Sequence, residues 1–197
     1  MPSQIDRLVE TIRELEAELE IQLAQRAEEL RIRILNGKID YTREILAAHR
    51  ALKSGLLKYV FGAAPLILLT IPFIYAIAVP LLLLDASVSL YQAVCFPIYG
   101  IPKVKRQDYL VFDRASLAYL NLIEKAHCAY CSYANGLLGY AREIAGRTEQ
   151  YWCPIKHAKR SKAAHGRYSR FVDYGDGEGY QKNLQKLRRD FKDAGNL

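Results

Sequence analysis

A stretch of 44 residues, from Tyr59 to Pro102, contains a single formally charged side chain, Asp85. Its first 26 residues, Tyr59–Leu84, carry no charge at all. About 20 consecutive apolar residues are enough for a helix to cross the hydrocarbon core of a bilayer. A helix of a soluble protein, by contrast, keeps a polar face for water. The stretch therefore predicts an integral membrane protein, with the lipid bilayer as its first partner.

The length of this stretch predicts a membrane hairpin over residues 59–102. It accommodates two tight spans, 59–77 and 81–101, with a turn near residues 78–80. Positive charge marks the cytoplasmic side of membrane segments. Basic side chains flank the stretch at both ends: Arg50, Lys53, Lys58, Lys103, Lys105 and Arg106. We therefore expect both the N- and the C-terminal regions in the cytoplasm. The alternatives are a deep hairpin, or one bent span followed by an interfacial helix from Asp85.

Asp85 has two interpretations. An ionisable residue inside a membrane is a candidate for an ion pathway, which makes an oligomeric channel or transporter one hypothesis. A turn near residue 80 instead places Asp85 within a turn or two of water, where charge is tolerated. We prefer this second interpretation.

The N-terminal segment, residues 1–37, predicts a long amphipathic helix of the coiled-coil type. Ser3 is a candidate N-cap, and Asn36-Gly37 is a candidate stop signal. Apolar residues recur at heptad spacing, with one stutter, at Ile5, Leu8, Ile12, Leu15, Leu19, Leu23, Ala27, Leu30 and Ile34. The first 30 residues hold eight acidic and three basic side chains, and Arg31, Arg33 and Lys38 follow. This polarity favours an antiparallel partner, either a second copy in a homo-oligomer or another protein. Packing against the protein's own connecting helix, residues 38–58, is an equal alternative.

Residues 103–158 predict a compact helical domain. Asp113 or Ser116 is expected to cap its first helix, and Gly136 to interrupt that helix. A second helix is expected to reach Gln150, and Pro154 to begin another segment. The remaining residues, 159–197, read as a basic tail that ends in an amphipathic helix. The expected fold class is thus an all-α membrane protein with a C-terminal Cys/His domain.

Cysteine and histidine side chains cluster in this domain. Five of them lie within 31 residues: His127, Cys128, Cys131, Cys153 and His157. Cys128 and Cys131 share one helix face, and Cys153 and His157 are expected to share a face of a second helix. If the two helices face each other, the Cys3His set suits a structural zinc or a single iron. Cys153 is expected at the N-cap of this helix, before Pro154. The positive end of the helix dipole there would favour its thiolate form.

Three other interpretations compete with a metal site. The Cys-x-x-Cys pair can cycle as a redox dithiol, although no thioredoxin-like context surrounds it. Buried cysteines also serve simply as small apolar fillers between helices. Glu124-x-x-His127 is half of a di-iron motif, but the second half is missing.

These patterns predict a binding protein more than an enzyme, because no catalytic triad, phosphate-cradling loop or dinucleotide fingerprint is present. Nucleic-acid binding is not needed to explain the basic charge, since basic residues beside membrane segments are expected. The function expected is that of a membrane-anchored, oligomeric accessory or scaffold protein with a cytosolic zinc or iron site. A redox or metal-handling membrane protein that uses Cys128, Cys131 and Cys153 is the alternative from another class.

Overall fold

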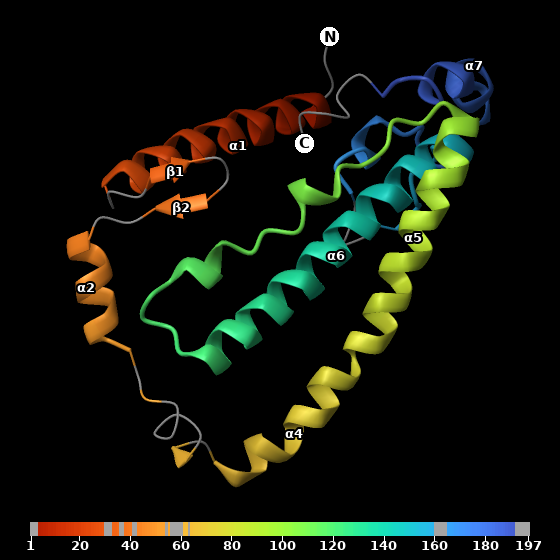
Figure 1. Cartoon of the computed structure of the whole chain (residues 1–197). Coiled ribbons are helices and arrows are strands. Elements are labelled where there is room, and N and C mark those ends of the chain that lie inside the picture. Colours follow the sequence, from red (N-terminus) through yellow and green to blue (C-terminus); the bar gives the residue numbers. More distant parts are fainter. Residues whose placement is uncertain are drawn as a thin grey trace. The chain divides into compact units, whose positions relative to one another are not determined.

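The computed structural model describes residues 4–29, 33–35, 38–40, 43–53, 55, 61–62, 64–159 and 165–191 (Figure 1). The chain divides into two compact units. The first contains Met1–Gly62 and Asp113–Ala129, and the second contains Ala63–Phe112 and Tyr130–Leu197. Each unit is described by itself.

The first unit begins with helix α1, Gln4–Glu29, which is followed by two short antiparallel strands, β1 (Arg33–Leu35) and β2 (Lys38–Asp40). The predicted helix therefore ends at Glu29 and does not continue to residue 37. Leu35 of β1 pairs with Lys38 of β2. The predicted stop signal, Asn36-Gly37, lies outside the described residues.

The connecting helix expected over residues 38–58 is shorter in the structure. Helix α2 covers Arg43–Ala51, and residues 54 and 56–60 lie outside the described part of the chain. In the same unit the ring of His49 meets the ring of Tyr119 edge to face, with centroids 5.1 Å apart. This contact connects the segment before the apolar stretch with the segment after it.

Helix α6 begins at Leu122, later than predicted, because a different residue caps it. Asn121 Oδ1 accepts a hydrogen bond from the backbone N–H of Glu124, and Glu124 Oε2 accepts one from the N–H of Asn121. This reciprocal pair is a capping box, which satisfies two otherwise unpaired donors at the helix start. Asp113 and Ser116, the predicted caps, belong to a short 3-10 turn instead.

In the second unit the apolar stretch forms helix α4, Pro65–Ala76, and helix α5, Ala78–Tyr99. They follow one another as a single bent rod with a break at Ile77, so the expected hairpin turn near residues 78–80 is not formed (Figure 1). Pro80 lacks the N–H that would bond the carbonyl of Ala76, and its ring crowds that carbonyl. The resulting break is local, because the N–H of Leu81 already bonds the carbonyl of Ile77. Among the described residues, the one helix long and apolar enough to cross a membrane is Pro65–Tyr99.

Helix α6 runs without interruption from Leu122 to Trp152, so the predicted break at Gly136 is absent. Gly136 is required by packing. A Cβ atom at this position would lie 2.5 Å from the carbonyl oxygen of Tyr109. Glycine costs a helix about 1 kcal/mol relative to alanine, but here it lets another stretch of backbone approach closely.

Helices α5 and α6 run side by side in the same direction (Figure 1). Successive contacts show this direction: Asp85 with Tyr133, Gln92 with Tyr140, and Tyr99 with Tyr151. Residues 101–110, which follow α5 in the same unit, lie against the pair, and the core of the unit lies where these three segments meet. That core contains Leu81, Phe96, Ile101, Val104, Leu110, Leu137, Tyr140, Ile144 and Phe191.

The end of the chain packs on the last turns of α6. No helix begins at Pro154; instead Ile155 makes an isolated parallel bridge with Val172. A 3-10 turn follows at Tyr168–Arg170, and helix α7 covers Gly177–Leu187. The predicted amphipathic helix of the tail is therefore present.

Candidate functional site

The predicted metal ligands occupy two separate places. His127, Cys128 and Cys131 lie in the first turns of α6, where Cys131 is exposed and the other two are half-buried. Cys153 and His157 are exposed and lie beyond the C-terminal end of α6. The expected second helix, on which Cys153 would be the N-cap, does not form.

The continuity of α6 keeps these two groups apart. At 1.5 Å per residue, the helix between Cys131 and Cys153 is about 33 Å long. No group of three or more histidine, cysteine or acidic side chains in the described part of the chain is placed to hold a metal ion. The structure thus does not bring the predicted ligands together within one chain. A zinc or iron site built from these residues stays a prediction.

The two histidines near the end of α6 have other contacts. The backbone N–H of His157 donates to the hydroxyl of Tyr168, and the two rings stack with centroids 6.0 Å apart. His165 is half-buried, and its Nε2 lies 2.9 Å from Oε2 of Glu149. A Cβ atom on Gly146 would lie 2.9 Å from the His165 ring. These contacts fix the segment that follows α6 against the helix.

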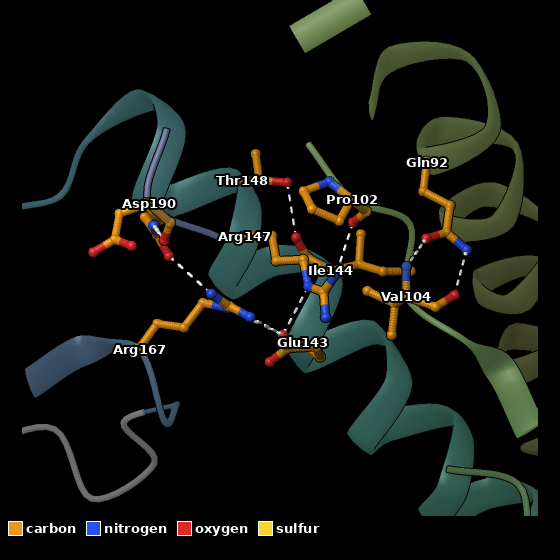
Figure 2. A network of polar contacts seen from close by, with 10 residues as sticks. Gln92, Pro102, Val104, Glu143, Ile144, Arg147, Thr148, Arg167 and Asp190 are labelled. Carbon is orange, nitrogen blue, oxygen red and sulfur yellow. Dashed lines mark hydrogen bonds and ion pairs between the residues drawn. The ribbon is translucent and has the colours of Figure 1, made fainter. Parts of the chain in front are cut away.

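A buried network of charged side chains lies at the centre of the second unit (Figure 2). Oε1 of Glu143 accepts a hydrogen bond from Nε of Arg147 at 2.8 Å and two from Arg167, at 2.9 and 3.0 Å. The exposed fractions are 7% for Glu143, 3% for Arg147 and 1% for Arg167. Charges this deeply buried are tolerated only when they are paired and hydrogen-bonded.

The same network ties four segments of the chain together. Arg147 donates to the carbonyl of Pro102, and Arg167 donates to Oε1 of Gln150. The amide nitrogen of Gln150 donates to the carbonyls of Leu187 and Asp190. The spacing of Glu143 and Arg147 was a visible i,i+4 signal. No local pattern in the sequence indicates that Arg167 is buried, because it lies among other basic residues of the tail. In the structure it is among the most buried side chains.

Asp85 holds a second polar cluster, at the point where the uncharged run ends. Its carboxylate accepts two hydrogen bonds from Arg106, at 2.5 and 3.3 Å, and one from the hydroxyl of Tyr133 at 3.0 Å. Hydrogen bonding to Asp85 raises the pKa of Arg106. Burial, followed by the bond to Asp85, raises the pKa of the Tyr133 phenol. Both groups therefore remain donors to Asp85 near neutral pH.

The unit also has a large apolar surface and two hollows. Helix α4 has no buried residue, and uncharged side chains continue to Leu84. One hollow, of about 560 Å³, is lined by Lys105, Arg106, Gln107, Leu110 and Phe112. The other, of about 320 Å³, is lined by Tyr99, Gly100, Tyr151, Gln185, Arg188 and Arg189. Sequence reasoning identified the apolar surface but neither hollow, because each is formed by residues distant in the chain or by an irregular segment.

Comparison of the chain with protein-family models, with curated proteins and with solved structures found no match.

Proposed function

We propose that this protein is a membrane-anchored accessory or scaffold protein. Lipid covers helix α4 and the first turns of α5. The rest of α5, together with α6 and α7, stays in water. Two exposed apolar features support a role in association: the uncharged helix itself and the apolar seam of α1. Both are surfaces for binding other molecules.

The observation that carries this proposal is the exposure of an uncharged, apolar helix. Helix α4 has no buried residue, and along Pro65–Leu84 only Leu81 is buried and no side chain is charged. Eight apolar side chains expose more than half of their surface: Leu66, Ile67, Leu69, Phe73, Ile77, Val79, Leu82 and Leu83. These 20 residues form about 30 Å of uncharged helix that lipid can cover. In water such a surface would drive association.

Both polar arms are proposed to lie on the same side of the membrane. The ring contact between His49 and Tyr119 supports this arrangement, because it joins the chain before the apolar helix to the chain after it. With both arms on one side and no hairpin turn, the helix is embedded in the bilayer from that side and does not cross it completely. The basic flanks, which include Lys53 and Lys103, favour the cytoplasmic side.

Self-association through α1 is the second part of the proposal. The described apolar side chains of its heptad seam are all exposed: Leu8, Ile12, Leu15, Leu19 and Leu23. A second copy packed against this seam would remove these apolar side chains from water.

A single charge placed in α4 tests the anchor. Leu69 in α4 is 68% exposed and Leu138 in α6 is 53% exposed, so Leu69→Asp and Leu138→Asp make the same change at two exposed helical sites. Asp at the centre of a membrane helix costs about 3 kcal/mol relative to a neutral residue. We expect Leu69→Asp to release the protein from phosphatidylcholine vesicles in a flotation assay. We expect Leu138→Asp to float like the wild type.

Two results would contradict the anchor. One is a wild-type protein that stays monodisperse without detergent and does not float with vesicles. The other is equal flotation of Leu69→Asp and the wild type.

A further inference from the structure

We propose that the larger hollow, lined by Lys105, Arg106, Gln107, Leu110 and Phe112, binds the phosphate head group of an anionic lipid. This inference rests on the proposed membrane anchor and adds a lipid preference to it.

The hollow lies level with the end of the uncharged helix. Asp85 directly follows Leu84, the last residue of the uncharged run. Two hydrogen bonds hold the guanidinium of Arg106 on the carboxylate of Asp85. If lipid covers the helix up to Leu84, this ion pair lies at the boundary between hydrocarbon and water. Arg106 and its neighbours in the hollow then lie at the depth of the lipid phosphates.

The polar side of the hollow carries donors for an anion. Arg106 has five N–H donors, and two of its hydrogen bonds go to Asp85. Its side chain is still 49% exposed. Lys105 and Gln107 are exposed beside it. Lysine and arginine side chains beside an anionic membrane surface are attracted to it, and a fixed guanidinium matches phosphate geometry.

The rest of the lining is apolar. Leu110 is buried in the core of the unit, whereas Phe112 and the adjacent Val111 are exposed. A free phosphate ion would gain nothing from these apolar side chains. A lipid carries apolar carbon atoms next to its phosphate, and these can contact them. The volume of about 560 Å³ lies within the usual range for small-molecule sites, about 300–1,000 Å³. The combination favours a lipid head group over a free anion.

The experiment compares two variants that each remove one positive charge. Lys105→Gln changes the proposed site. Arg189→Gln changes an exposed arginine in the smaller hollow, beside Tyr99. Along α5, Tyr99 lies about 21 Å from Asp85. Binding is measured by flotation with phosphatidylcholine vesicles and with vesicles that also contain phosphatidylglycerol, and the preference is the ratio of the two affinities.

We expect the wild type to prefer the phosphatidylglycerol vesicles. Lys105→Gln should reduce this preference about fivefold, since one basic residue near an anionic surface contributes that much. Arg189→Gln should keep the wild-type preference. Binding of both variants to phosphatidylcholine alone should be unchanged, because α4 is intact.

Three outcomes would overturn the assignment of the lipid site while leaving the anchor in place. The first is binding to both vesicle types without a preference. The second is an equal loss of preference in the two variants, which would indicate diffuse electrostatic attraction. The third is loss of the preference when inorganic phosphate replaces chloride at matched ionic strength, which would indicate a site for free phosphate. Failure to bind either vesicle would instead contradict the anchor itself.

Discussion

Gly136 and Tyr109 are in direct contact: a Cβ atom added to Gly136 would lie 2.5 Å from the carbonyl oxygen of Tyr109. The contact lets the segment that returns from α5 lie against α6. It also explains why a residue that disfavours helices is found within a continuous helix. The glycine does not end α6 but makes room for the backbone of a neighbouring segment.

We expect Gly136→Ala to destabilise the protein by about 1–3 kcal/mol, the usual cost of overpacking. This loss should exceed the gain of about 1 kcal/mol in helix propensity. Gly177→Ala is a suitable control, because a Cβ atom there meets nothing within 4 Å. Thermal unfolding in detergent, followed by circular dichroism, measures both variants. A midpoint for Gly136→Ala above that of the wild type would show that the contact with Tyr109 is not tight.

Glu143→Gln should be more damaging than the loss of an exposed ion pair. It removes the carboxylate that pairs with Arg147 and Arg167 and leaves both guanidinium groups buried. Breaking a buried pair in this way costs about 3–5 kcal/mol. Asp173→Asn breaks the ion pair of the exposed Asp173 with Lys156, which is worth about 1 kcal/mol or less. Unfolding by urea compares the two, and equal losses would contradict the structural role of the buried network.

The five predicted metal ligands should not form a site within a monomer. Cys131 and Cys153 are both exposed and about 33 Å apart along α6. We expect each to react with a maleimide independently. We expect no disulfide between them, since that bond requires Cα atoms within about 7 Å. Stoichiometric zinc in a monomeric preparation, lost in both Cys131→Ser and Cys153→Ser, would contradict the continuity of α6.

Leu15→Glu should weaken self-association, because Leu15 belongs to the exposed seam of α1. Ile21→Glu makes a similar change at an exposed position of α1 that lies off the seam. Sedimentation velocity in detergent measures the oligomeric state of each variant. We expect a shift to smaller species for Leu15→Glu alone. An identical shift for both variants would indicate a general effect of added negative charge.

Several features were predictable from local patterns. The uncharged run predicted the exposed apolar helix, because the run is longer than the roughly 20 apolar residues that a membrane helix needs. Heptad spacing predicted α1 as far as Glu29. The Asn121–Glu124 capping box is also a local pattern in the sequence, although Asp113 or Ser116 was the predicted cap. In each case the residues that set the structure are neighbours in the chain.

Other features depend on contacts between distant residues. Whether Gly136 ends a helix is decided by the backbone of Tyr109, which comes from another segment. Arg167 looks like a solvent-exposed charge until Glu143 and Gln150 of α6 are placed around it. The positions of Cys131 and Cys153 likewise follow from the uninterrupted course of α6. Local sequence specifies helix propensity and hydrophobic surface, whereas the burial of a charge and the separation of two ligands depend on which segments pack together.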